Sequence, residues 1–348
     1  MKKTLLAMSL ALTMGSSFAA DLPNITILAT GGTIAGTASS STQTTEYKPG
    51  QLAIETLISA VPEMTAVADV TGEQVANIGS ESMTNEVWLK LAKRCNELLA
   101  KPDVDGIVIT HGTDTLEETA YFLTLTVKSK KPVVIVGAMR PATAISADGP
   151  LNLLNAVKVA ASAESHNKGV LVAMNDEINA GRDVTKTYTT NVDTFHSPVF
   201  GSLGVIVDGK PLFYRLPVKA HTTSTEFDIS NLTKLPRVDI VYSHANDDGV
   251  MTDAAVKAGA QGIIHAGTGN GSIHGNTEQA LKRAATQGVV VVRSSRTGSG
   301  YVTPNTGYRA LGLLEADTLN PQKARVLLQL ILTKTKDPAK VQAMLDTY

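Results

Sequence analysis

The sequence predicts an α/β fold with two domains: a larger N-terminal domain whose mostly parallel sheet is flanked by helices, and a smaller C-terminal α/β domain. Three observations predict it. Short runs rich in β-branched residues recur along the chain, and each is almost continuously apolar, as in strands that are buried on both faces. Apolar residues at helical spacing lie between several of these runs. A stretch rich in Thr and Ser, without a sustained period, interrupts the series at 217–228.

The predicted strands occupy residues 25–30, 106–110, 133–137, 170–174, 238–242, 262–266 and 289–293. The predicted helices occupy residues 85–100, 116–127 and 149–162. Strand, helix and strand in repetition favour parallel strands with helices on both faces. We expect an N-terminal domain over 20–215, a linker over 216–229 and a C-terminal domain over 230–348. The alternative is one continuous sheet with a long excursion at the linker.

The first residues have the composition of a secretory signal peptide. Lys2 and Lys3 precede an apolar run over 4–14 that is too short to span a bilayer, and small residues stand at Ser17 and Ala19. We therefore expect a signal peptide over residues 1–19, cleavage after Ala19 and a periplasmic mature protein.

Composition limits the expected partners and cofactors. The chain has 348 residues, a formal charge of −1 and 4% aromatic residues, so neither nucleic acid nor an anionic membrane is an expected partner. The single cysteine, Cys95, lies at helical apolar spacing, as a core thiol does. The seven histidines form no ligand-spaced pair, which argues against a metal site. The default expectation is a small soluble substrate.

Two similar turns follow buried strands. Thr-Gly-Gly-Thr at 30–33 and Thr-His-Gly-Thr at 110–113 each come just after a predicted strand, at the edge where open α/β sheets build their sites. A hydroxyl at Thr33 could attack a carbonyl while neighbouring amides stabilise the oxyanion. The alternatives are a phosphate loop or a tight turn, although the spacing matches neither a dinucleotide fingerprint nor a Walker A loop.

Two charged residues could complete such a site. Asp114 stands where a helix begins, and Thr115 and Glu118 have the spacing of a capping box, so helix capping competes with substrate binding as its role. Lys186 follows the fourth predicted strand in a polar loop. A lysine acts as a base only after losing its proton, which burial favours and a carboxylate such as Asp114 opposes. The alternative for Lys186 is a solvated surface charge.

Two further loops have the composition of ligand loops. Gly-Ser-Glu-Ser at 79–82 offers a hydroxyl at Ser80 and a carboxylate at Glu81 that could grip the backbone groups of an amino acid, and Ser80 could equally start the next helix. A glycine-rich loop at 267–271, which includes Asn270, follows the sixth predicted strand and has the flexibility of a binding loop.

The order and content of these motifs resemble the bacterial type II L-asparaginases, the secreted members of the asparaginase/glutaminase family. The motifs are Ala-Thr-Gly-Gly-Thr-Ile-Ala-Gly at 29–36, Thr-His-Gly-Thr-Asp-Thr at 110–115, Gly-Ala-Met-Arg-Pro at 137–141, Ser-Ala-Asp-Gly-Pro at 146–150, Asp-Val-Thr-Lys at 183–186, Val-Arg-Ser-Ser-Arg at 292–296 and Leu-Asn-Pro-Gln-Lys-Ala-Arg-Val at 319–326. They run over essentially the whole mature chain. The resemblance implies hydrolysis of L-asparagine to L-aspartate and ammonia, with side activity on L-glutamine and no cofactor.

The resemblance also implies catalytic roles. Thr33 resembles the nucleophile that forms the acyl-enzyme, and Tyr47 resembles the residue that accepts its proton. Thr113, Asp114 and Lys186 resemble a second cluster, which activates water and binds the amino group of the substrate.

Other positions match substrate-binding residues of the family. Ser80 and Glu81 match the pair that holds the α-carboxylate and α-amino groups, where many members carry Gln in place of Glu81. Asn270 matches a residue that reaches the site of the neighbouring subunit, in a family of homotetramers built from intimate dimers. The chain departs from the family at 297–310, which holds no acid where a carboxylate is usual; Glu315 is the nearest candidate.

Other functions fit part of the sequence. A glutaminase-asparaginase would use both amides, because discriminating one methylene is typically worth only about 1–3 kcal/mol. A periplasmic amino-acid-binding protein would also suit two α/β domains, and it would retain asparagine intact. A nucleotide-binding role is the third alternative. The absence of a phosphate-loop lysine argues against it.

Overall fold

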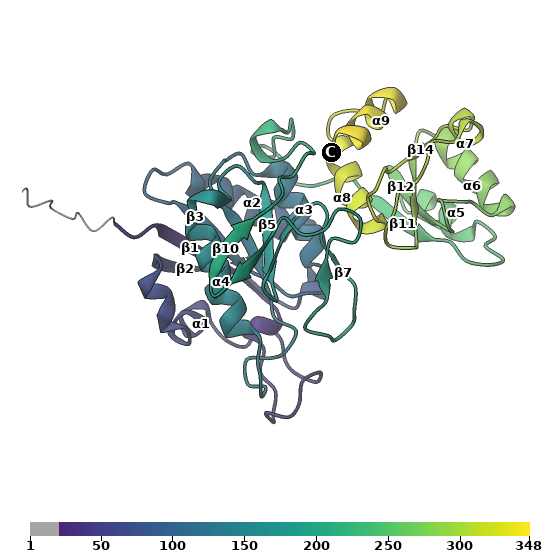
Figure 1. The fold of residues 1–348 in the computed structure, drawn as a ribbon. Coiled ribbons are helices and arrows are strands. Elements are labelled where there is room, and N and C mark those ends of the chain that lie inside the picture. Colours follow the sequence, from purple (N-terminus) through teal and green to yellow (C-terminus); the bar gives the residue numbers. More distant parts are fainter. Residues whose placement is uncertain (1–20) are drawn as a thin grey trace, which may run out of the picture.

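The computed structural model describes residues 21–348, so the predicted signal peptide lies outside the described residues. Two α/β domains lie side by side, as the sequence predicts (Figure 1). The alternative of one continuous sheet is wrong, because the strands form an eight-stranded sheet and a separate four-stranded sheet.

The N-terminal sheet has the strand order β10-β9-β6-β5-β4-β3-β1-β2. Its strands are β1 (Asn24–Gly31), β2 (Asp69–Ile78), β3 (Gly106–Thr110), β4 (Val133–Val136), β5 (Val170–Met174), β6 (Glu177–Ala180), β9 (Gly204–Val207) and β10 (Lys210–Phe213). The pairs from β5 to β2 are parallel, whereas β6, β9 and β10 pair in antiparallel fashion. The sheet is therefore mixed but mostly parallel. A separate two-stranded ribbon joins β7 (Thr185–Lys186) to β8 (Phe195–His196).

Four helices belong to this domain, namely α1 (Ile54–Ser59), α2 (Asn85–Leu99), α3 (Leu116–Thr126) and α4 (Gly149–Ala161). α4 packs against β3, β4 and β5, while α2 and α3 pack against each other. Cys95 on α2 is fully buried, and burial raises the pKa of its thiol to about 12. The expectation of a core thiol is confirmed.

The C-terminal sheet is parallel throughout, with the order β11-β12-β13-β14. Its elements are β11 (Val238–Tyr242), α5 (Val250–Lys257), β12 (Gly262–Gly267), α6 (Gly275–Thr286), β13 (Val290–Ser295), α7 (Thr306–Ala310), β14 (Leu313–Glu315), α8 (Pro321–Ile331) and α9 (Pro338–Thr347). The predicted linker falls between β10 and β11 and contains a single 3-10 turn, η5 (Thr222–Ser224).

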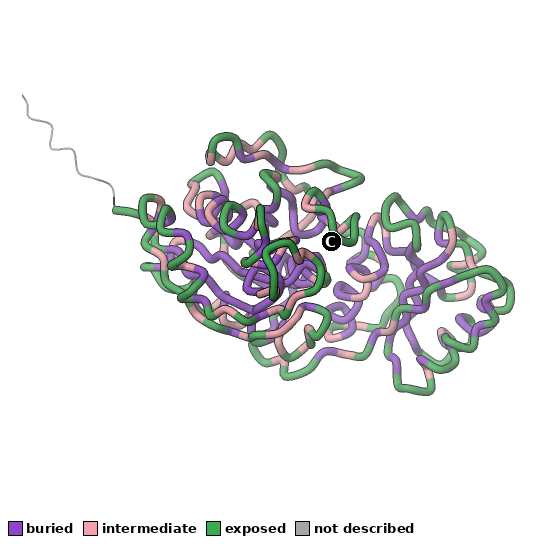
Figure 2. Tube along the Cα trace, turned by 90° about the horizontal axis from the view of Figure 1, so that it is seen from below, coloured by how far each residue is buried: buried purple, intermediate pink, exposed green. Residues whose placement is uncertain are grey.

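Helix α8 lies at the junction of the two domains. It begins at Pro321 after Asn320, whose side chain accepts a hydrogen bond from the backbone of Lys323. It contacts α3 of the N-terminal domain on one side and the strands β11, β12 and β13 on the other. Its buried residues belong to a hydrophobic cluster that includes core residues of both domains, and buried segments run through both domains in Figure 2. One apolar core therefore continues through α8 from the first domain into the second.

Candidate active site

Three neighbouring strands end at the edge of the N-terminal sheet that carries the predicted site. β1 lies between β2 and β3 and pairs with both in parallel, so the chain leaves all three strands at this edge. The turn after β1 touches the turn after β3, since a Cβ atom on Gly32 would lie 2.3 Å from the Cα atom of Gly112. Gly32 also has a φ of 83°, which favours glycine. The two threonine turns therefore meet backbone to backbone.

Thr33 and Tyr47 form a hydroxyl pair in the first turn. Thr33 begins the 3-10 turn η1 (Thr33–Ala35) and is 5% exposed. Its Oγ1 lies 2.6 Å from the phenol oxygen of Tyr47, and either hydroxyl can donate. Thr37 and Lys48 exchange backbone hydrogen bonds of 3.1 and 3.0 Å, which close the loop that carries Tyr47 over η1. A proton can thus pass directly between these two oxygens.

Lys186 lies among the polar groups of the second turn. Its Nζ donates to Thr113 Oγ1 at 3.0 Å and to Asp114 Oδ1 at 2.7 Å. The side chain of Lys186 is 15% exposed, whereas that of Asp114 is 60% exposed. Lys186 is therefore not the solvated surface charge considered as its alternative. The open side of the Asp114 carboxylate remains accessible to a ligand that carries an ammonium group.

Ser80 connects the end of β2 to this cluster. Its hydroxyl accepts a hydrogen bond of 3.1 Å from the backbone N–H of Asp114, and its carbonyl accepts one of 2.7 Å from Thr115 Oγ1. Ser80 is 4% exposed and lies in the 3-10 turn η3 (Ser80–Ser82). It does not start α2, because Thr84 caps that helix by accepting from the backbone of Val87. The helix-start reading of Ser80 is wrong.

The capping box considered for Asp114 is not formed. Thr115 is the N-terminal cap of α3 but makes no side-chain capping bond to any described residue, since its hydroxyl is turned toward Ser80. The Asp114 carboxylate is bonded to Lys186 instead. Glu118 is half-buried, and burial raises the pKa of its carboxyl to about 7. The prediction of a capping box is therefore wrong, and Asp114 does not cap α3.

The remaining predicted residues lie apart from these bonds. Glu81 is exposed and bends back over Gly79, where a Cβ atom would lie 2.2 Å from Glu81 Oε1. Asn270 is exposed on the C-terminal domain, where its Nδ2 donates to Thr303 Oγ1 at 2.6 Å and its Oδ1 accepts from the Thr303 backbone at 2.9 Å. Asn270 thus has a fixed orientation on a loop remote in sequence from the threonine turns.

Glu315 does not replace the carboxylate that is missing from 297–310. It lies on β14 with 2% exposure and forms an ion pair with Arg309. Its backbone N–H donates to Gln342 on α9 at 3.1 Å. The expectation for Glu315 as the nearest candidate is wrong, because β14 turns this side chain inward rather than toward a site.

His111 has a structural role in the second turn that the sequence analysis does not single out. Its Nδ1 lies 2.7 Å from the Gly112 carbonyl oxygen and its Nε2 lies 2.8 Å from Thr119 Oγ1. Burial lowers the pKa of His111 to about 4, so the ring is neutral at pH 7. A neutral ring with its proton on Nδ1 donates to Gly112 and accepts from Thr119, which itself accepts from Trp88 Nε1. The sequence feature that could have identified His111 is its position within the motif at 110–115.

Other features of the described residues do not compete for the chemistry. A cavity of about 620 Å³ is lined by Arg182, Gly201, Leu216, Val218 and neighbours, and none of the predicted site residues lines it. In residues 21–348 no three His, Cys, Asp or Glu side chains are grouped so that they could hold a metal ion. Over the same range, no helix combines the length and the apolar content that crossing a membrane requires.

The chain is similar to proteins of known family over both domains. Residues 24–219 match the family described as Asparaginase, N-terminal, and residues 237–345 match the Glutaminase/Asparaginase C-terminal domain. The chain is 59% identical to L-asparaginase 2 of Bacillus subtilis over 94% of its length and 87% of that protein. It is 55% identical to the probable periplasmic L-asparaginase of Haemophilus influenzae over 100% of both chains. The crystal structure of a probable cytoplasmic L-asparaginase from Campylobacter jejuni matches with a TM-score of 0.92 and 54% identity, over 94% of this chain and 100% of that one.

Proposed function

The chain belongs to the asparaginase family and is an L-asparaginase, and from this premise we propose that it hydrolyses L-asparagine in two half-reactions through an acyl-enzyme on Thr33. The observation that carries the proposal is the 2.6 Å contact between Thr33 Oγ1 and the Tyr47 phenol, next to the cluster of Thr113, Asp114 and Lys186. No cofactor takes part in this scheme.

In the first half-reaction, Thr33 Oγ1 attacks the side-chain carbonyl carbon of asparagine. Tyr47 takes the hydroxyl proton as the new C–O bond forms, and the proton is passed to the amide nitrogen. The C–N bond then breaks and ammonia leaves, which yields a β-aspartyl ester on Thr33. The burial of Thr33 supports this role, because a dry site strengthens each hydrogen bond to the developing charge.

In the second half-reaction, water attacks the ester carbonyl. Lys186 donates to Thr113 Oγ1, so a free lone pair of that oxygen can accept a hydrogen bond from the attacking water and orient it. As the water adds, the proton that it releases passes to Thr33 Oγ1, the ester C–O bond breaks, and aspartate leaves. The water supplies the oxygen of the new carboxylate, and the net reaction converts asparagine and water into aspartate and ammonia.

Substrate recognition falls to two exposed carboxylates and one buried hydroxyl. Asp114 is open to solvent on one side and would take the α-ammonium group together with Glu81, while Ser80 would hold the α-carboxylate. Glu81 stands where many family members carry Gln, so L-glutamine is proposed as a side substrate. The name of the C-terminal family, which includes glutaminases, supports that proposal.

The assembly and the location are proposed with the same function. A homotetramer of intimate dimers would bring Asn270 of one subunit to the site of another, and the exposed position of Asn270 on the C-terminal domain supports this. A periplasmic location is supported by the predicted signal peptide and by the periplasmic relative of Haemophilus influenzae. Light scattering and cell fractionation test these two points.

Ammonia release separates the enzyme from a binding protein. Purified protein incubated with L-asparagine should release ammonia and aspartate in equal amounts, and the same assay with L-glutamine gives the side activity. Retention of intact asparagine, with no ammonia, would instead identify an amino-acid-binding protein and would overturn the proposal.

A further inference from the structure

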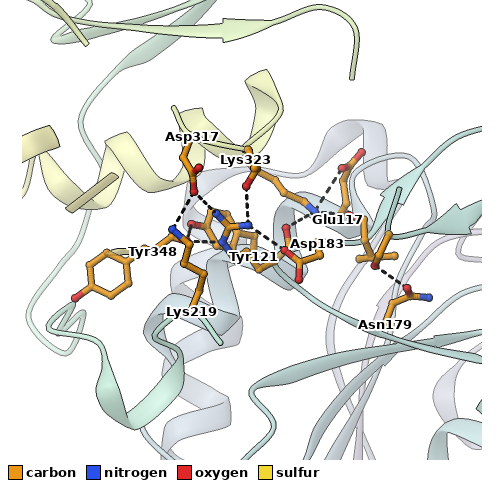
Figure 3. A network of polar contacts seen from close by, with 12 residues as sticks. Glu117, Tyr121, Asn179, Asp183, Lys219, Asp317, Lys323 and Tyr348 are labelled. Carbon is orange, nitrogen blue, oxygen red and sulfur yellow. Dashed lines mark hydrogen bonds and ion pairs between the residues drawn. The ribbon is translucent and has the colours of Figure 1, made fainter. Parts of the chain in front are cut away.

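Lys323 is a fully buried lysine that the proposed reaction does not use. It lies in the first turn of α8 with 2% exposure. Figure 3 shows its side chain extending from the pale C-terminal helix toward Glu117 of the N-terminal domain. Burying an ammonium group costs several kcal/mol unless partners compensate it, so its contacts indicate what it stabilises.

The polar partners of the Lys323 ammonium lie in the N-terminal domain. Its Nζ donates to the Arg182 carbonyl at 2.7 Å and also to the Val184 carbonyl. It lies 3.9 Å from Glu117 Oε2, and Glu117 is in turn bonded by Asn320 at 2.9 Å. Burial lowers the pKa of Lys323 to about 8, against the raising effect of the nearby Glu117, so the ammonium stays largely charged at pH 7.

These partners belong to the two segments that carry the second cluster of the site. Val184 lies two residues before Lys186, and Glu117 lies three residues after Asp114 in the first turn of α3. Lys323 therefore connects the backbone segment 182–186, which carries Lys186, to helix α3, which follows Thr113 and Asp114. Since Lys186 must reach both of these side chains, the spacing between the two segments sets its position.

We propose that Lys323 is a positioning residue, through which the C-terminal domain holds Lys186 against Thr113 and Asp114 for the hydrolysis of the acyl-enzyme. The inference rests on the proposed function. It differs from a general domain contact because the Lys323 ammonium is bonded to the backbone of the 182–186 segment itself.

A second contact from the start of α8 supports the same geometry. Asn320 donates to Thr185 Oγ1 at 3.4 Å as well as to Glu117, so it also touches both segments. The side chain of Arg182 also donates to the Tyr348 backbone oxygen at 2.5 Å and to Asp317 Oδ2 at 3.3 Å. The segment before Lys186 is thus anchored to the C-terminal domain at several points.

Lys323→Met tests the proposal with Lys219→Met as the matched control. Lys219 lies in the same network, where it bonds Asp317 at 2.9 Å and the Asp346 carbonyl at 2.6 Å, but within the described residues it has no hydrogen bond to the 182–186 backbone. For Lys323→Met we expect kcat to fall by about 10- to 100-fold, because misplacement by about 1 Å costs roughly 100-fold, with KM for L-asparagine changed by less than about threefold. Lys219→Met should retain kcat within about twofold.

Hydrogen exchange on the free protein tests whether Lys323 holds the 182–186 segment, independently of the reaction. Amides of residues 182–187 should exchange at least about tenfold faster in Lys323→Met than in the wild type or in Lys219→Met. If Lys323→Met fails to fold because Glu117 is left buried and unpaired, Lys323→Met combined with Glu117→Gln removes that charge and carries the same expectations.

The results that would overturn the proposal are specific. One is a folded Lys323 variant whose kcat stays within about twofold of the wild type. Another is an equal loss of kcat in the Lys323 and Lys219 variants. The third is an unchanged rate of hydrogen exchange at 182–187. Failure of the proposed function is distinct: the wild-type protein would then release no ammonia, while the exchange comparison would still decide whether Lys323 holds the segment.

Discussion

Gly32 and Gly112 bring the two threonine turns into backbone contact, with only 2.3 Å between the Gly112 Cα and the position that a Cβ on Gly32 would take. Gly32→Ala should therefore separate the turns and reduce kcat by about 100-fold or more. Gly259→Ala is the matched control, since Gly259 has a similar φ of 86° but open space around it. It should cost about 1 kcal/mol of stability and leave ammonia release unchanged. Equal activities of the two variants would show that the contact does not matter.

Thr33→Ala should abolish turnover and leave the fold and the assembly intact. The substitution removes the attacking oxygen, and the loss expected is at least about 1,000-fold in kcat. Ammonia release measures the activity, and circular dichroism with light scattering measures the fold and the oligomer. Thr45→Ala, at an exposed position of the loop that carries Tyr47, is the control and should stay near wild-type activity. Substantial ammonia release by the Thr33 variant would remove the nucleophile from the scheme.

Lys186→Met should cripple the hydrolysis of the acyl-enzyme more than its formation. With Lys186 gone, Thr113 and Asp114 lose the donor at 3.0 and 2.7 Å, and kcat should fall by about 100- to 1,000-fold. Rapid mixing should then reveal a burst of ammonia equal to the concentration of sites, followed by slow turnover. Near-normal rates in this variant contradict the water-activating role.

Glu81→Gln should change the ratio of glutaminase to asparaginase activity. The Glu81 carboxylate is exposed and follows Ser80 in the chain, so in the proposed scheme its charge would act on the amino group of the substrate rather than on the reacting carbonyl. We expect KM values to change by up to about tenfold, and kcat for L-asparagine to change less. Parallel ammonia assays with the two amides measure both, and a large fall in kcat alone would place Glu81 nearer the reacting atoms.

The burial of His111 should make the protein sensitive to acid. Its pKa is lowered from 6.5 to about 4 in the folded state, so the neutral ring stabilises the fold fully above pH 6.5. This contribution is lost as the pH falls from 6.5 through 4, by about 3 kcal/mol in total. Urea titrations at pH 7 and pH 4 measure the free energy of unfolding. Between these two pH values, the loss of this free energy should be smaller in His111→Gln than in the wild type by about the same amount.

The control for this titration is an exposed histidine. His166 is exposed, so His166→Gln should follow the pH dependence of the wild type. The free energy of unfolding could instead depend on pH identically in the wild type, His111→Gln and His166→Gln. That result would mean that the turn at 110–113 opens and lets His111 take up a proton without global unfolding.

The central strands could be predicted from sequence because they are buried on both faces. β3, β4 and β5 are continuous apolar runs, and the structure places them where the pattern does. β2 is at the edge of the sheet and has a single buried residue, so its side chains form no continuous apolar run and the sequence analysis does not predict it. β9 and β10 were also missed, although Asp208-Gly209 between them, both with positive φ, is a strong signal for a two-residue hairpin.

The site residues were easier to identify than their contacts. The matching turns at 30–33 and 110–113 follow adjacent parallel strands, so strand order alone brings them together. The position of Lys186 could not be predicted from its neighbours in the sequence, because the side chains that it contacts, Thr113 and Asp114, lie 73 and 72 residues earlier. From the sequence, Lys323 would be interpreted as a surface charge of an amphipathic helix. Its burial follows only from the packing of α8 between α3 and the C-terminal sheet.

The position of α8 near the end of the chain affects how the protein is made. A ribosome completes β1 to β10 and α3 long before it adds residues 321–331, so the surface of α3 that α8 will cover stays bare during most of synthesis. The nascent N-terminal half therefore presents an apolar patch to chaperones or to other nascent chains. Proteins truncated before α8 should accumulate as aggregates rather than as a free first domain.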